Sequence, residues 1–233
     1  MERLDKFLVS QSVGSRKEVS KLIRTGRVLV NGVPCADSAR KIDPETETVT
    51  LDGRKVTYKK HLYILMNKPA GVLSATEDSR QKTVLDLLPP ALSRRGLFPA
   101  GRLDKDTTGL LLITDDGELA HRMLAPKSHV YKRYLARLER PVTQEDMDAF
   151  EKGVTYGDLH FAPARLWAGE EPNTAYTEIR EGKFHQVKRM FEAVGNRVTD
   201  LTRVQIGSLK LPEELSPGEA REAAPEEIVR IFM

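Results

Sequence analysis

Cysteine is almost absent from this sequence, whose 233 residues contain only one, Cys35. A single thiol excludes an internal disulfide framework, and we expect Cys35 to pack as a small hydrophobic residue in a reducing compartment. The five histidines are scattered without the spacing of a metal site, and no glycine-rich phosphate loop is present. The sequence therefore predicts that no cofactor, metal or nucleotide, is required.

Long hydrophobic runs are also lacking. No stretch of the sequence is long enough to cross a membrane, and the first residues are charged instead of forming an apolar signal segment. Apolar residues make up 39% of the chain and charged residues 30%, as is usual for a globular protein with one substantial core and a small satellite domain. We expect a cytoplasmic monomer without a membrane partner.

Positive charge is concentrated in the N-terminal quarter. Residues 1–60 contain 13 Lys and Arg against 8 Asp and Glu, a net charge of +5, whereas the rest carries −2. A helix is expected at residues 3–8, and Ser15 with Glu18 forms a capping-box pattern that starts a second one, which ends at Gly26. A strand at residues 27–30 then turns at Asn31-Gly32, a strong hairpin signal.

The basic side chains of this quarter are candidates for RNA binding. Lys17, Lys21 and Arg24 are spaced so that they share one helix face. Contacts from such side chains to phosphates supply affinity without sequence information, and the affinity falls as salt rises. A basic face that is only solvated is the alternative interpretation. The candidate RNA contacts are Arg3, Arg16, Lys17, Lys21, Arg24 and Arg27.

Turn-rich segments at 43–47 and 52–54 separate this quarter from the rest of the chain, and we place the domain boundary near residue 60. The predicted domains are 1–60 and 61–233. Strands outnumber helices in the second domain without a regular alternation, so the sequence predicts an α+β fold with a mixed, mostly antiparallel sheet. The expected strands are 62–66, 72–74, 110–114, 132–138, 162–167, 174–180 and 198–206, and the expected helices 84–88, 118–124, 143–153 and 185–194.

The segment from Gly101 to Gly109 is the most informative part of the sequence. It contains Arg102 and Asp104 in a glycine-bounded turn, directly before a short apolar run that indicates a buried strand. Asp104 is therefore expected at the edge of a rigid sheet, where an enzyme would hold a nucleophile. The alternative is that Asp104 only caps a turn.

Three motifs resemble the RsuA-type branch of the pseudouridine synthases, which modifies ribosomal RNA. Gly101-Arg102-Leu103-Asp104 followed by Thr107-Thr108-Gly109-Leu110-Leu111 is similar to the catalytic motif of this family. The run from Glu181 to Phe191 is similar to the third motif, and Tyr131-Lys132-Arg133-Tyr134-Leu135 stands where the family has its active-site tyrosine. The motifs occur in the family's order, and the resemblance covers essentially the whole chain. The N-terminal quarter resembles the small α-L RNA-binding domain.

The resemblance implies an isomerisation of uridine to pseudouridine, which needs no cofactor, with Asp104 as the ionised catalytic carboxylate that acts as nucleophile or base. Lys188 stands where much of the wider superfamily has an arginine, and it is expected to keep Asp104 charged. The alternative for Lys188 is an exposed residue on an amphipathic helix. His185 and Gln186 are expected to brace the cleft, and His185 to serve as the polar cap of its helix.

Three further substrate contacts follow from the resemblance. Tyr134 is expected to stack on the extruded base, the alternative being a core tyrosine. Arg102 is expected to occupy the space that the flipped nucleotide leaves or to bind a phosphate, and the alternative is a salt bridge with Asp106. Ile206 matches a position that packs against the base, although the sequence alone indicates only a core residue.

The resemblance favours the small-subunit enzyme, which modifies uridine 516 of 16S RNA in the family's convention, with naked RNA or an assembly intermediate as the partner. A large-subunit 23S uridine is the second possibility. Two alternatives from other classes are a noncatalytic rRNA-binding assembly factor and a glycosidase-like hydrolase. The hydrolase would need a second acid, for which Asp106 is the only close candidate.

Overall fold

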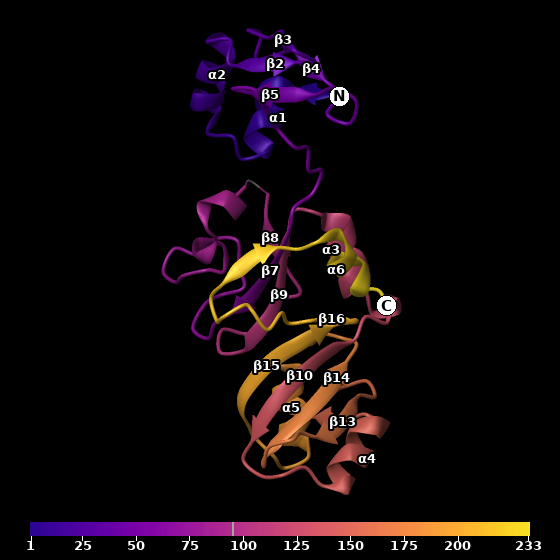
Figure 1. The fold of residues 1–233 in the computed structure, drawn as a ribbon. Helices are drawn as coiled ribbons and strands as arrows, with labels where there is room; N and C mark the ends of the chain where they lie inside the picture. Colours follow the sequence, from indigo (N-terminus) through magenta and orange to yellow (C-terminus); the bar gives the residue numbers. More distant parts are fainter. Residues whose placement is uncertain (95) are drawn as a thin grey trace. The chain divides into compact units, whose positions relative to one another are not determined.

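The computed structural model describes residues 1–94 and 96–233, and the chain divides into two compact units (Figure 1). The first contains residues 1–62 together with 89–96, and the second contains 63–88 and 97–233. The return of 89–96 to the first unit was not expected from the sequence. Every helix within the described residues is too short or too polar to cross a bilayer.

The N-terminal unit has two helices packed on short strands. The capping box of Ser15 and Glu18 is present at the start of α2, as predicted. Asn31 and Gly32 both have positive φ values, 52° and 80°, which is the backbone conformation that the predicted hairpin turn requires. The elements are β1 (Glu2–Arg3), α1 (Leu4–Ser10), α2 (Arg16–Arg24), β2 (Val28–Val30), β3 (Val33–Pro34), β4 (Lys41–Ile42), β5 (Val49–Leu51), β6 (Arg54–Lys55) and the 3-10 turn η2 (Pro90–Leu92).

A large mixed sheet forms the second unit, in the order β13-β14-β10-β15-β9-β7-β17, with β16 added to β15 and β8 to β9. Strand β15 pairs in parallel with β9, and the other named strand pairs of this sheet are antiparallel, which confirms the predicted fold class. The strands are β7 (Tyr63–Lys68), β8 (Phe98–Ala100), β9 (Thr108–Thr114), β10 (Lys132–Leu138), β13 (Arg165–Ala168), β14 (Thr174–Ile179), β15 (Val198–Ile206), β16 (Leu209–Lys210) and β17 (Ala220–Glu222).

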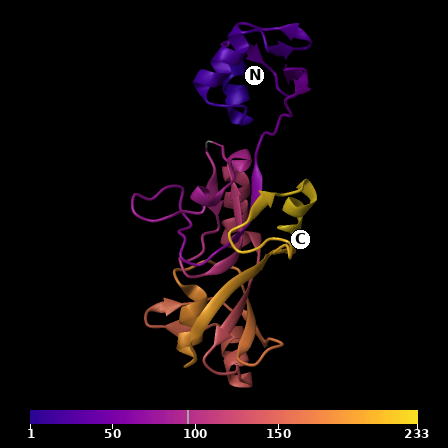
Figure 2. The same ribbon diagram turned by 60° about the vertical axis from the view of Figure 1, so that its left-hand side comes forward.

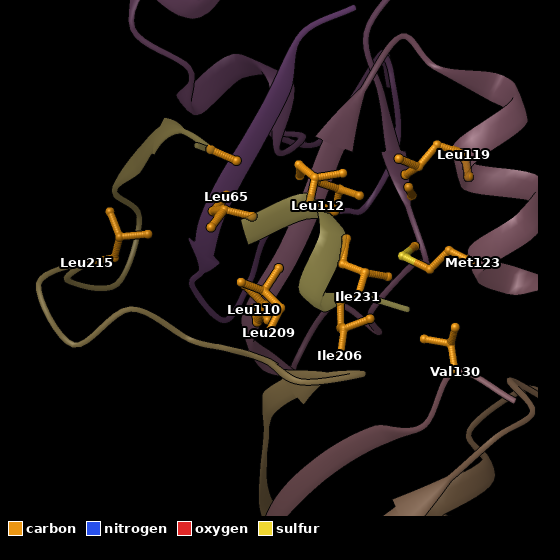
Figure 3. Close-up of a cluster of buried hydrophobic side chains, with 14 residues drawn as sticks. Leu65, Leu110, Leu112, Leu119, Met123, Val130, Ile206, Leu209, Leu215 and Ile231 are labelled. Carbon is orange, nitrogen blue, oxygen red and sulfur yellow. The ribbon is translucent and has the colours of Figure 1, made fainter. Parts of the chain in front are cut away.

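Helices and a hairpin complete the second unit. The rings of Phe150 on α4 and Phe191 on α5 lie 5.0 Å apart, so these two helices pack together. The remaining elements are η1 (Leu85–Leu87), α3 (Gly117–Leu124), η3 (Pro126–Ser128), α4 (Gln144–Lys152), the hairpin of β11 (Thr155–Tyr156) and β12 (Leu159–His160), α5 (Gln186–Ala193) and α6 (Pro225–Arg230). A core cluster joins the β7–β9 strands to α3 and α6 (Figure 3).

The parallel contact between β15 and the start of β9 joins the two halves of the sheet, and β15 runs from beside β10 to this junction (Figures 1 and 2). Gly109 has φ 97°, and a Cβ atom there would lie 2.3 Å from the carbonyl oxygen of Arg203. Only glycine allows the two strands to approach so closely. The buried Arg203 guanidinium reinforces the junction, because it donates to the carbonyl oxygens of Leu110 and Gly101, each at 2.8 Å.

Three sequence predictions need correction. Residues 72–74 form no strand, and Leu73 makes only an isolated bridge with Thr83. The strand expected at 162–167 begins at Arg165, because residues 162–164 include Pro163, which cannot donate to a ladder. The helix expected at 84–88 is the single 3-10 turn η1, since Pro89 and Pro90 follow at once and prevent its extension.

Candidate active site

Asp104 lies in a cleft of the second unit. A small cavity of about 70 Å³ is lined by Asp104, Tyr134 and Lys188, with aliphatic walls from Ile179, Val187 and Leu201. A larger cavity of about 590 Å³ shares Asp104 and Tyr134 with it. The Asp104 side chain is 29% exposed, so its carboxylate is accessible and still partly shielded from water.

The turn that carries Asp104 connects β8 to β9 and is held by hydrogen bonds to its main chain. The amide of Thr107 donates to the carbonyl oxygen of Asp104 at 3.2 Å. The hydroxyl of Ser74 accepts from the amide of Leu103 at 3.1 Å and donates to its carbonyl oxygen at 2.9 Å. The residue before the carboxylate is thereby fixed on both sides, which limits the freedom of Asp104.

Lys68 also holds this turn, and it was not among the residues predicted from the sequence. Its side chain is fully buried at the end of β7, and Nζ donates to the carbonyl oxygens of Asp104, Lys105 and Thr107 at 2.9–3.2 Å, and to that of Pro69 at 3.1 Å. Burial lowers the pKa of Lys68 to about 8, although Asp106 and Asp104 oppose the shift. The available signal was a lysine at the end of a mostly apolar strand, because a buried ammonium must find several acceptors.

A lysine and a histidine lie beside the Asp104 carboxylate. Lys188 Nζ is 3.6 Å from Asp104 Oδ2 and 2.6 Å from Asp106 Oδ1, so one ammonium serves both acids. Its hydrogen bond lowers the pKa of Asp106. His185 Nε2 is 3.7 Å from Asp104 Oδ1. The predicted capping role of His185 is wrong: the residue has φ 53° and makes no side-chain cap hydrogen bond, because its ring is turned to the cleft.

Tyr134 and Ile206 are both on the sheet but in different environments. Tyr134 is 8% exposed, lines the cleft, and shares one face of β10 with Ala136 and Leu138. Ile206 is 1% exposed and packs in the core cluster with Leu209 and Ile231, away from the cavity lining (Figure 3). The aliphatic wall beside Asp104 comes instead from residues that the sequence analysis did not single out.

Arg102 is an exposed residue that lines the cleft. The salt bridge with Asp106 that was considered for it does not form, since Asp106 pairs with Lys188. Among residues 1–94 and 96–233, no ion pair of Arg102 is found, so its guanidinium is available to a substrate.

The predicted RNA contacts of the N-terminal unit fall into two groups. Arg3 is paired with Asp5 at 2.7 Å, and Arg27 is paired with Asp52, so part of their charge is compensated. The other four lie on α2 and are exposed, with no ion pair found for them in the described part of the chain: Arg16, Lys17, Lys21 and Arg24.

Thr107 lines the small cavity and carries a hydroxyl without a partner. Its residue is 2% exposed, and among the described residues its Oγ1 is the buried side-chain oxygen or nitrogen that lacks a hydrogen-bond partner. The neighbouring Thr108 hydroxyl, in contrast, lies 2.8 Å from that of Thr202. A buried unpaired hydroxyl is unfavourable, so a substrate group in the cavity would supply what the protein lacks.

We expect Thr107→Val to lower kcat/KM for the enzyme's reaction roughly five- to tenfold while changing the free energy of unfolding by less than about 1 kcal/mol. Urea unfolding and single-turnover kinetics check both values. Thr108→Val is the matched control and should destabilise the fold instead. Unchanged kinetics in Thr107→Val would show that the hydroxyl contacts no substrate.

Comparison with known proteins identifies the family. The RNA pseudouridylate synthase model matches residues 62–193, and the S4 domain model matches residues 2–47. An uncharacterised RNA pseudouridine synthase of Bacillus subtilis is 49% identical, covering 97% of this chain and 96% of its own. The ribosomal small subunit pseudouridine synthase A of Vibrio cholerae is 42% identical, covering 99% of each chain, and that of Escherichia coli is 40% identical, covering 98% of this chain and 99% of its own.

A solved structure described as a pseudouridylate synthase has a TM-score of 0.67 and 34% identity, covering 99% of this chain and all of that one. The fold, the family models and the full-length relatives therefore agree. This chain belongs to the RNA pseudouridine synthase family and is an enzyme of that family with an S4 domain at its N-terminus.

Proposed function

We propose that this enzyme converts uridine 516 of the small-subunit 16S ribosomal RNA to pseudouridine, acting as a cytoplasmic monomer. The observation that supports this substrate is the full-length similarity, at 40–42% identity, to proteins named ribosomal small subunit pseudouridine synthase A. The RNA is the free 16S RNA or a small-subunit assembly intermediate, and a large-subunit uridine is the competing substrate.

Asp104 is proposed as the catalytic carboxylate. The reaction breaks the C1′–N1 bond, turns the detached uracil and joins C5 to C1′, so all atoms of the nucleotide are conserved except the hydrogen exchanged at C5. An ionised carboxylate near C1′ is needed as nucleophile or base. The ammonium of Lys188, 3.6 Å from the carboxylate, is placed to favour its charged form when RNA excludes water, and the ring of His185 lies 3.7 Å away.

The small cavity is proposed to receive the base. A uridine within folded RNA must be extruded before its sugar can reach a carboxylate in a cleft. Tyr134 offers a flat surface beside Asp104, and Ile179 and Leu201 supply apolar walls. Arg102, which is exposed and without an ion pair among the described residues, is proposed to occupy the space left in the RNA or to bind a phosphate.

The exposed basic face of α2 is proposed to bind RNA phosphates through Arg16, Lys17, Lys21 and Arg24, with Arg3 and Arg27 contributing less because they are ion-paired. Such contacts position the RNA without reading its sequence.

The geometry does not favour a glycosidase-like hydrolase. That reaction needs a carboxylic acid that is still protonated when it meets the leaving group. Asp106, the nearest candidate, has its pKa lowered by the hydrogen bond from Lys188 and is 73% exposed. It is therefore ionised at neutral pH and cannot act as a general acid.

The function is tested by tritium release from RNA labelled at uracil C5. Purified enzyme is incubated with 16S transcript, 23S transcript and small-subunit particles, and the product is mapped by chemical probing for pseudouridine. We expect release only with small-subunit RNA and a single modified position at uridine 516. Release from the 23S transcript alone would refute the proposed substrate and support the large-subunit alternative.

A further inference from the structure

A buried lysine lines the larger cavity and has one weak hydrogen bond. Lys132 is 6% exposed, and its Nζ makes one long hydrogen bond, 3.4 Å, to the carbonyl oxygen of Met123. Within residues 1–94 and 96–233, no carboxylate lies within ion-pair distance of it. Lys68, the other buried lysine of this unit, has four hydrogen-bond acceptors. Burial therefore does not by itself explain why Lys132 has so few.

The two acids that line the cavity with Lys132 are engaged elsewhere. Asp104 lies beside Lys188 and His185. Glu181 accepts from the amide of Ala162 and from the side chain of Gln186, each at 2.9 Å, and is 3.2 Å from Lys183 Nζ. Neither carboxylate neutralises Lys132.

The remaining charges around Lys132 are mostly positive. Arg102, Lys183 and Arg203 also line this cavity. Burial, with added repulsion from Arg203, lowers the pKa of Lys132 to about 8. The ammonium is still mainly protonated at neutral pH. A buried cation with such neighbours is costly to keep, which points to a bound anion that completes the site.

We propose that Lys132 binds a phosphodiester of the substrate RNA next to the target uridine. The small cavity that is proposed for the base is lined by Tyr134 but not by Lys132, whereas the larger cavity is lined by both. Lys132 and Tyr134 lie on the same face of β10, because side chains alternate between the two faces of a strand. A base beside Tyr134 therefore brings its neighbouring phosphate toward Lys132. This inference depends on the proposed function only for the choice of RNA.

The test combines a neutral variant with a neutral phosphate. We expect Lys132→Met to raise KM roughly 10- to 100-fold, as for loss of a hydrogen bond to a charged group, with a smaller change in kcat. Two RNAs are compared, each with one uncharged methylphosphonate linkage, placed on one side of the target uridine or on the other. At one of these two positions the linkage should raise the KM of the wild-type enzyme by a similar factor. The same linkage should raise the KM of Lys132→Met by less than about twofold, because this variant has already lost the charge pair.

Urea unfolding separates this role from a structural one. Loss of an unpaired buried charge should leave the midpoint of Lys132→Met unchanged or raise it. Lys210→Met, which removes an exposed lysine on β16, is the control for nonspecific loss of charge and should leave both KM and the midpoint near wild type.

Equal methylphosphonate penalties in wild type and Lys132→Met at both linkages would overturn the proposal, whatever the stability of the variant. The assay uses whichever ribosomal RNA the wild-type enzyme modifies. A large-subunit target would therefore refute the proposed function while the role of Lys132 is still tested.

Discussion

Asp104→Asn is expected to lower the rate of uridine isomerisation by at least about 10³-fold while the dissociation constant for RNA changes less than about threefold. The amide keeps the shape of the side chain but removes the negative charge, so it can act neither as nucleophile nor as base. Tritium release under single-turnover conditions measures the rate, and filter binding measures the affinity.

Asp106→Asn is the matched control for Asp104→Asn. Both acids contact Lys188, but the Asp106 side chain is 73% exposed and does not line the cavities that hold Asp104. We expect this variant to lose less than about tenfold in rate, through a less well placed Lys188. If Asp104→Asn kept an undiminished rate, the assignment of the catalytic carboxylate would be wrong.

Lys68→Met is expected to lower kcat/KM by about 100-fold and the free energy of unfolding by about 2–3 kcal/mol. Methionine fills a similar volume but leaves without a donor the carbonyl oxygens of the turn that carries Asp104. The turn loses its fixed position, and small displacements of a catalytic group have large effects on rate. Urea unfolding and tritium release give the two values.

Lys105→Met is the control for this variant. Lys105 is in the same turn but exposed, and its Nζ contacts Gln81 Oε1. It should behave like wild type in both measurements. A Lys68→Met enzyme with wild-type activity would show that the turn holds its geometry without the ammonium.

The contribution of Lys68 to stability should also depend on pH. Its pKa is about 8 in the folded protein and near 10.5 in the unfolded chain, so the unfolded state binds more protons between these values. Stability rises with pH wherever the unfolded state binds more protons. The difference in unfolding free energy between wild type and Lys68→Met should therefore grow from pH 8 to 10.5. A constant or shrinking difference would contradict the lowered pKa.

Local patterns predicted much of the fold because they depend on neighbouring residues. The capping box at Ser15, the turn at Asn31-Gly32 and the strands at 132–138 and 198–206 follow from short-range hydrogen bonding and hydrophobic alternation. The errors lie where a local pattern competes with its surroundings. Val72 and Leu73 are apolar enough for a strand, but within the described residues the only strand-like pairing of 72–74 is the isolated bridge of Leu73 with Thr83.

The sequence by itself determined the family, the α+β class and the place of Asp104 between two glycines, because each depends on residue types in order along the chain. The tertiary structure alone decided which groups meet there. Three lysines illustrate this. Lys68 donates to four carbonyl oxygens, Lys188 lies beside two carboxylates, and Lys132 makes one long hydrogen bond to a carbonyl oxygen. The charge environment of a lysine depends on strands far apart in sequence, and only folding brings them together.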